Sequence, residues 1–171
     1  MVIEKDCKPL DYIWTPWRMK YIQERHNEAG CVFCLAAEAD DSVENLVFNR
    51  GEAVFMILNR YPYTSGHIMC VPYVHVDRLQ DLPRVARVEL MDMVSKAVEV
   101  LQSVYEPQGF NIGLNLGEVA GAGIADHLHM HIVPRWGGDT NFMSAVGQTR
   151  VLPESLLETY RRVKEAWDGL A

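Results

Sequence analysis

Long apolar runs are missing from this sequence. No stretch approaches the roughly 20 apolar residues that span a bilayer, and the opening residues MVIEKDCKPLDYIW lack the apolar core of a signal peptide. Internal repeats, low-complexity tracts and linkers rich in Gly, Ser and Pro are also missing. We therefore expect a cytoplasmic protein that has no membrane partner.

Positive charge is also scarce. The 171 residues carry 16 Lys and Arg against 23 Asp and Glu, a net charge of −7. Such a chain repels a phosphate backbone unless its basic residues gather in one place, so we do not expect a nucleic-acid partner. With 49% hydrophobic residues the chain can bury a core. We predict a single domain over residues 1–171, with an N-terminal arm (1–30), a catalytic core (31–145) and a C-terminal helical segment (146–171).

Cysteines are few. A chain with no secretion signal is expected to keep its four thiols reduced. Cys31 and Cys34 therefore indicate half of a metal site rather than a disulfide, because structural zinc takes four ligands. Cys70, in the apolar run HIMCVP, is predicted to be a small buried hydrophobe.

The pattern of apolar residues predicts an α+β fold. Five runs rich in β-branched residues indicate strands at about 45–49, 53–58, 67–71, 110–116 and 127–133. Apolar residues at steps of three and four predict a long helix after Pro83, with Leu90, Val94, Ala97, Val98, Leu101 and Val104 on one face. A C-terminal helix is predicted after Pro153, with Leu156, Leu157, Tyr160, Val163 and Trp167 on its apolar face.

Three of the six histidines alternate with apolar residues in DHLHMHIVPRW. Side chains two apart on a strand share a face, so His127, His129 and His131 would line one surface while Leu128, Met130 and Ile132 face a core. A solvated face that happens to carry histidine is the alternative. Three imidazoles in register favour a reactive site.

The segment HLHMHIV resembles the signature of the histidine-triad family, in which His and apolar residues alternate. ILNRYPYTSGHIMCVPYVHVDRL is similar to the family's other recurrent stretch, and GLNLGEVAGAGIADHLHMHIVPRWGGDTNFM is similar to its branch of bacterial diadenosine tetraphosphate phosphorylases. The resemblance covers about residues 12–145. It implies a bent antiparallel sheet with helices, a homodimer, and action on adenosine nucleotides or dinucleoside polyphosphates.

The same resemblance implies roles for three histidines. His129 is similar to the family nucleophile that forms a covalent nucleotidyl-histidine, and His131 and His67 resemble the residues that flank the phosphate. The chemistry agrees, because a neutral imidazole is a competent nucleophile near pH 7 and a covalent intermediate divides one displacement into two steps.

Further substrate contacts are implied more weakly. Asn59 resembles a nucleotide-contacting residue, although Asn before a turn also serves turn chemistry. Gly117, Gly121 and Gly123 suit close approach to phosphate or simply form a flexible loop. The loop residues Asp139, Thr140 and Asn141 resemble a phosphate-side loop, with an ordinary turn as the alternative. In the arm, Trp14, Trp17 and Arg18 could reach adenine or phosphate, or pack a dimer.

The resemblance also completes the metal site. In zinc-bearing relatives the remaining ligands are the residues that correspond to His75 and His127. A Cys2His2 set would hold structural zinc and leave no position open for water. Two buried thiols and two surface imidazoles are the alternative.

One departure bears on the reaction. The hydrolytic branch usually has a glutamine four residues before the triad, where this chain has Gly123. We therefore expect inorganic phosphate, rather than water, to be the second reactant, giving ATP and ADP from diadenosine tetraphosphate. A hydrolase of dinucleoside polyphosphates or of adenosine phosphoramidates, and a non-catalytic zinc-stabilised nucleotide-binding module, are the alternatives. A sugar-phosphate nucleotidyltransferase is less favoured, because its triad typically ends in Gln rather than His131.

Overall fold

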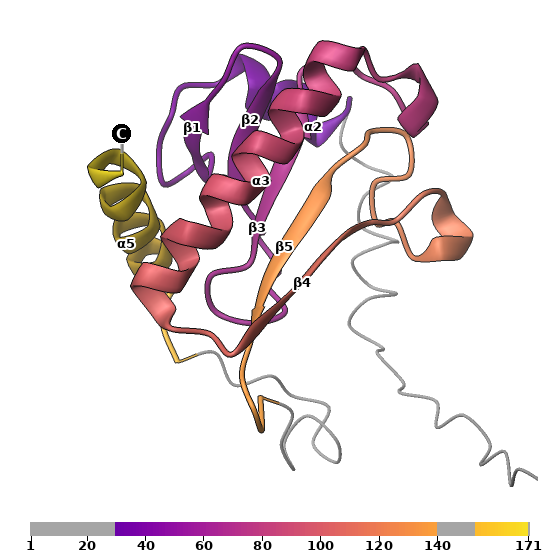
Figure 1. The fold of residues 1–171 in the computed structure, drawn as a ribbon. Helices are drawn as coiled ribbons and strands as arrows, with labels where there is room; N and C mark the ends of the chain where they lie inside the picture. Colours follow the sequence, from indigo (N-terminus) through magenta and orange to yellow (C-terminus); the bar gives the residue numbers. More distant parts are fainter. Residues whose placement is uncertain (1–29, 140–152, 171) are drawn as a thin grey trace, which may run out of the picture.

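A five-stranded antiparallel sheet organises the chain in the computed structural model, which describes residues 30–139 and 153–170 (Figure 1). The strands are β1 (Val47–Arg50), β2 (Val54–Leu58), β3 (Ile68–Pro72), β4 (Gly109–Leu114) and β5 (Met130–Arg135). Their order is β1-β2-β3-β5-β4. The α+β prediction and the number of strands are confirmed.

Within the described residues, the helices are α2 (Val32–Glu38), α3 (Arg84–Tyr105) and α5 (Leu156–Gly169), with short 3-10 turns η2 (Leu79–Asp81) and η3 (Glu118–Ala120). In Figure 1, α3 crosses one face of the sheet and α5 lies beside β1. No helix in the described ranges is long and apolar enough to cross a membrane.

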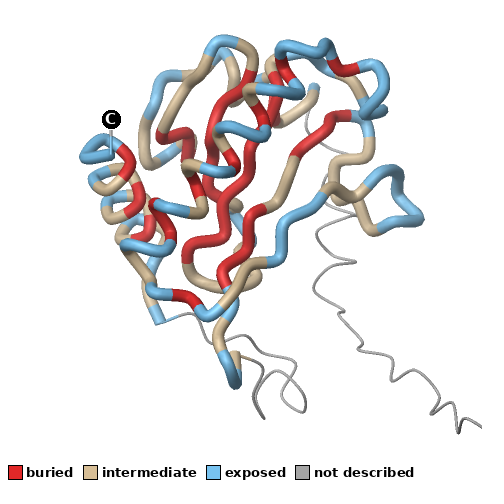
Figure 2. The backbone as a smooth tube through the Cα atoms, in the orientation of Figure 1, coloured by how far each residue is buried: buried red, intermediate tan, exposed pale blue. Residues whose placement is uncertain are grey.

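Helix α3 forms where the apolar spacing predicts it. Pro83 is its N-cap, and its buried side chains recur at helical steps: Ala86, Leu90, Val94, Ala97, Val100 and Leu101. Val98 and Val104 are only partly buried. This stripe packs on the sheet, which Figure 2 shows as a buried centre through β2, β3 and β5.

Helix α5 begins one residue after Ser155, whose hydroxyl accepts a hydrogen bond from the backbone N–H of Glu158. The helix buries Thr159, Val163 and Trp167, four residues apart. Leu157, predicted to lie on the apolar face, is instead 62% exposed because it points away from that stripe.

One strand boundary is corrected, and one helix was not predicted. Strand β5 begins at Met130 rather than at 127, because the pairing of both neighbouring strands with β5 ends at that residue. Residues 127–129 approach the sheet without joining it, with Leu128 N–H bonded to the carbonyl of Val76. The other missed feature is α2, a seven-residue helix whose N-cap is Cys31 and whose first turn contains Cys34.

The register brings distant polar residues onto one face. Met69 pairs with His131 across β3 and β5, and His131 pairs with Gly113 across β5 and β4. His67 lies two residues before Met69 and therefore shares its face. The Asn59 N–H donates to the carbonyl of His67, so the pairing of β2 with β3 extends one residue beyond the two strands.

Candidate functional site

Three histidines meet on this face: His67 just before β3, His129 just before β5, and His131 on β5. The His67 and His131 ring centroids lie 5.1 Å apart, and those of His129 and His131 lie 4.9 Å apart. His67 and His129 are buried, with 1% and 5% of their surfaces exposed, whereas His131 is half-buried. The structure thus brings together the three histidines that the sequence predicts to be catalytic.

Backbone groups select the tautomers of His67 and His131. The N–H of Tyr63 lies 3.1 Å from His67 Nδ1, and because a backbone amide only donates, Nδ1 must accept. The His67 proton is then on Nε2, which lies 2.9 Å from His131 Nδ1 and donates to it. His131 consequently carries its own proton on Nε2.

The tautomer of His129 is the opposite one. Its Nδ1 lies 2.8 Å from the carbonyl oxygen of His127, and because a carbonyl only accepts, Nδ1 must carry the proton. The Nε2 atom of His129 is left with its lone pair. A nucleophilic nitrogen therefore stands beside a ring that presents an N–H.

Asn59 lies against this histidine pair. Its side-chain oxygen accepts the N–H of Tyr61 at 2.8 Å, which fixes the amide orientation. Its Nδ2 lies 3.4 Å from His67 Nε2 and donates to the sulfur of Met69 at 3.5 Å. The Asn59 side chain therefore both stabilises the turn at Tyr61 and lies beside His67.

The second cluster consists of Cys31, Cys34, His75 and His127. One ligand atom from each lies within 4.8 Å of all the others. Cys31 Sγ lies 3.3 Å from His127 Nδ1, and Cys34 Sγ lies 3.3 Å from His75 Nδ1. This geometry can hold a metal ion, with the N-cap and the first turn of α2 supplying the two thiols.

The outer contacts of the two imidazoles fit metal binding. His127 Nε2 lies 2.8 Å from the carbonyl of Pro72 and donates to it, so its Nδ1 lone pair faces the thiols. The Asp126 carboxylate lies 3.8 Å from His75 Nε2. Burial lowers the pKa of His127 and outweighs the hydrogen bond to Pro72, which raises it. The lowered pKa favours the neutral imidazole, the form that binds a metal ion.

The charges around the thiols favour a cation. Burial is the main cause that raises the pKa of Cys34, and Cys31, Glu38 and Asp126 raise it further. A metal ion would compensate this negative surrounding and stabilise the thiolates. The donor set and its environment therefore fit a bound metal.

The remaining predicted substrate residues lie in loops. Gly117 and Gly121, with φ of 81° and 89°, flank η3, and Gly123 follows in the half-buried approach to His127. Asp139 closes a turn, where its carboxylate accepts from Arg135 and from the N–H of Trp136. Trp14, Trp17, Arg18, Thr140 and Asn141 lie outside the described residues.

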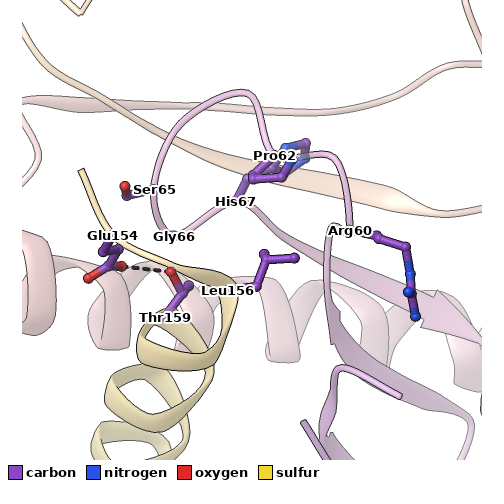
Figure 3. Close-up of a pocket in the computed structure, with 8 residues that line it drawn as sticks. All are labelled: Arg60, Pro62, Ser65, Gly66, His67, Glu154, Leu156 and Thr159. Carbon is purple, nitrogen blue, oxygen red and sulfur yellow. Dashed lines mark hydrogen bonds between the residues drawn. The ribbon is translucent and has the colours of Figure 1, made fainter. Parts of the chain in front are cut away.

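A cavity of about 140 Å³ lies behind His67, between the segment that precedes β3 and the start of α5. Figure 3 labels its lining residues, among them Arg60, Ser65, Glu154 and Thr159. Ser65 Oγ is buried there and has no hydrogen-bond partner among the described residues. His67 is itself a lining residue, so the cavity adjoins the candidate site at that histidine.

Sequence reasoning missed two aromatic residues at the site. The Tyr63 ring lies 4.6 Å from His67 and the Phe33 ring lies 4.9 Å from His129. Phe33 could have been suspected, because it stands between the two cysteines. Nothing in the periodicity around Tyr63 points to the histidines, since that contact depends on a turn.

Comparison with known proteins agrees with this geometry. A family model described as the HIT domain matches residues 41–138. A Mycobacterium tuberculosis protein named AP-4-A phosphorylase is 43% identical over 166 residues, which cover 92% of this chain and 85% of the relative. The asymmetrical bis(5'-nucleosyl)-tetraphosphatase of Schizosaccharomyces pombe is 33% identical over 97 residues, covering 57% of this chain and 53% of the relative.

A solved structure shares the fold. The Zn-bound histidine triad family protein from Mycobacterium smegmatis aligns with a TM-score of 0.65 and 26% identity, over 82% of this chain and 95% of that one. The relatives named here thus include nucleotide-processing enzymes and a metal-bearing protein.

Proposed function

This chain belongs to the HIT domain family, and from that membership we propose that it cleaves diadenosine tetraphosphate by phosphorolysis to ATP and ADP. The observation that carries the proposal is the bond from His129 Nδ1–H to the His127 carbonyl, which leaves the lone pair on His129 Nε2, in a ring that packs against His131. A relative named AP-4-A phosphorylase that covers most of the chain supports the same substrate.

The reaction proceeds in two displacements. His129 Nε2 attacks the α-phosphorus of one adenylyl group, the bond to the bridging oxygen breaks, and ATP leaves. Inorganic phosphate then attacks the adenylyl-histidine, and ADP forms as the nitrogen regains its lone pair. His131 Nε2–H donates to a phosphate oxygen and disperses its developing charge.

The substrate contacts are assigned from the same face. We assign Asn59, which follows β2 and lies beside His67, as a nucleotide contact. Gly121 and Gly123 allow the backbone before the triad to approach phosphate. Asp139, Thr140 and Asn141, together with Trp17 and Arg18 of the arm, remain proposed contacts from the resemblance alone.

The test is product analysis. Purified protein is incubated with diadenosine tetraphosphate, with and without inorganic phosphate, and the nucleotides are separated by ion exchange. We expect ADP and ATP only when phosphate is present, and no products from His129→Ala. ATP and AMP formed regardless of phosphate would make the enzyme a hydrolase instead.

We propose zinc as the ion held by Cys31, Cys34, His75 and His127. Two thiolates and two imidazoles close a tetrahedral site, so the metal would stabilise the fold around α2 rather than bind substrate. Elemental analysis should give about one zinc per chain, and Cys34→Ser should lose it. Cys70→Ala is the matched control, because Cys70 is buried on β3 within the sheet.

We also propose a homodimer formed through β4. This strand pairs with β5 on one side, and among the described residues no strand covers its other edge. Asn111, Ile112 and Gly113 are exposed there, visible in Figure 2 as the pale edge of the sheet. An uncovered edge strand is a template for pairing with a second copy.

A further inference from the structure

Phe33 is the ring that joins the metal-type cluster to the candidate nucleophile. It lies between Cys31 and Cys34 and is 3% exposed. Its centroid is 5.4 Å from that of His127, edge-on at 70°, and 4.9 Å from that of His129. The ring contacts continue in one series through His75, His127, Phe33, His129, His131 and His67.

Helix α2 sets the position of this ring. At its carboxyl end, Arg50 donates to the carbonyls of Ala36, Ala37 and Ala39, which ties that end to β1. At its amino end, Cys31 and Cys34 face the two imidazoles. A metal that clamps the two thiols would therefore restrain the helical turn that carries Phe33.

The ring in turn limits the movement of His129. The hydrogen bond from His129 Nδ1 to the His127 carbonyl anchors one atom of the imidazole, whereas neighbouring rings limit its tilt. Phe33 packs at 45° to the imidazole plane, and His131 packs at 73°. In-line attack is sensitive to such alignment, since a 1 Å misplacement costs up to about 100-fold in rate.

We propose that Phe33 is a positioning residue that transmits occupancy of the Cys31–Cys34–His75–His127 cluster to the His129 ring. Metal-free protein would keep its sheet but hold the nucleophile less firmly. The catalytic consequence rests on the proposed function of His129, whereas the position of the ring can be measured without any nucleotide.

The first experiment follows the His129 ring by NMR. Full-length protein with isotope-labelled histidine is stripped with a chelator and titrated with Zn²⁺ alone, and the His129 ring signals are assigned by substitution. We expect them to shift on metal binding in the wild type. Phe33→Leu, which keeps most of the volume, should still bind one metal ion but lose most of that shift.

The control retains the ring. Phe33→Tyr should bind zinc and restore the response of His129, and amide spectra check that each variant keeps the sheet. The bond from His129 to the His127 carbonyl offers a direct route that bypasses Phe33. An equal His129 shift in Phe33→Leu and wild type would assign the effect to that route and overturn the proposal, as would an unchanged His129 signal in the wild type.

The second experiment measures covalent adduct formation by rapid quench and intact mass, with all proteins zinc-loaded. Phe33→Leu should form the adduct about tenfold more slowly at saturating substrate, with KM unchanged. A raised KM with unchanged kcat would make Phe33 a substrate contact and overturn the proposal. If the wild type forms no adduct, the proposed function fails, and the NMR result alone decides the coupling.

Discussion

Four of the five histidines in the two clusters carry their proton on a nitrogen that a neighbouring group selects. The carbonyls of His127 and Pro72 leave lone pairs on His129 Nε2 and on His127 Nδ1. The N–H of Tyr63, acting through His67, leaves a proton on His131 Nε2. One residue type would therefore serve as the proposed nucleophile, as a proton donor and as a metal ligand, because different neighbouring groups contact each ring.

We expect His67 to affect the rate of adduct formation through its hydrogen bond to His131. Replacing His67 by Leu removes the Nε2–H donor that selects the His131 tautomer, and we expect adduct formation on His129 to slow by about 100-fold. His67→Gln keeps a side-chain N–H and should lose less. Intact mass over a quenched time course measures both rates, and equal losses in the two variants would exclude this role.

Gly66, next to His67, should tolerate no side chain. Its φ is +75°, and a Cβ would lie 2.8 Å from the ring of Tyr105. We expect Gly66→Ala to lower the free energy of unfolding by about 1–3 kcal/mol. Gly109→Ala is the matched control, because a Cβ there meets no atom within 4 Å. Urea titration compares the two, and a similar loss in both would contradict the steric argument.

At the scale of elements, the ends of α3 and α5 are joined by polar contacts beside the His67 segment. Glu154, just before α5, accepts from Arg162 at 2.8 Å and from Thr159 at 2.7 Å, and also from the Tyr105 hydroxyl. Burial opposes ionisation of Glu154, but these three bonds outweigh it and lower its pKa below the ordinary value of 4.5.

Stability should therefore depend on pH through Glu154. Its folded pKa is the lower one, so its contribution is complete above pH 4.5 and is lost as the pH falls through the folded value. We expect Glu154→Gln to be less stable at neutral pH and to lose less stability than the wild type between about pH 5 and pH 3. Denaturant unfolding at several pH values measures this.

The exposed Glu165, which contacts Arg161 at 3.2 Å, provides the comparison. Glu165→Gln should leave the profile close to that of the wild type, because exposed pairs contribute little. If the free energy of unfolding of Glu154→Gln falls with pH in parallel with that of the wild type, the contacts of Glu154 are not the cause of the loss of stability in acid.

At the scale of the whole molecule, the two edges of the sheet differ. The β1 edge is covered, because Tyr160 and Lys164 of α5 donate to the carbonyls of Val47 and Phe48. The β4 edge has no such cover within the described residues, and Ile112 is 45% exposed on it. This asymmetry favours the β4 edge as the site of the proposed dimer contact.

Ile112→Glu should therefore disrupt the proposed dimer, because it buries a like charge on both copies of the interface. Light scattering after size exclusion should give about twice 19.5 kDa for the wild type and a mass near 19.5 kDa for the variant. Val119→Glu, in the exposed η3 turn, should remain dimeric. Wild-type protein that is monomeric at high concentration would contradict the proposal.

Local patterns in the sequence determined the elements of this fold. Helical spacing from Leu90 to Leu101 and β-branched runs identified α3 and the five strands, because side-chain periodicity follows directly from backbone geometry. The alternating histidines and the Cys31–Cys34 pair likewise indicated two polar clusters. Helix α2 was not predicted, since seven residues are too short for the periodic signal that identifies longer helices.

Tertiary structure decided how those residues work together. His67 meets His131 only because β3 pairs with β5, and the strand begins at Met130 because pairing with both neighbours ends there. The choice of tautomer depends on backbone groups of Tyr63, His127 and Pro72, whose positions come from turns and packing. Periodicity assigns a side chain to a face, whereas its partners across that face depend on non-local strand pairing.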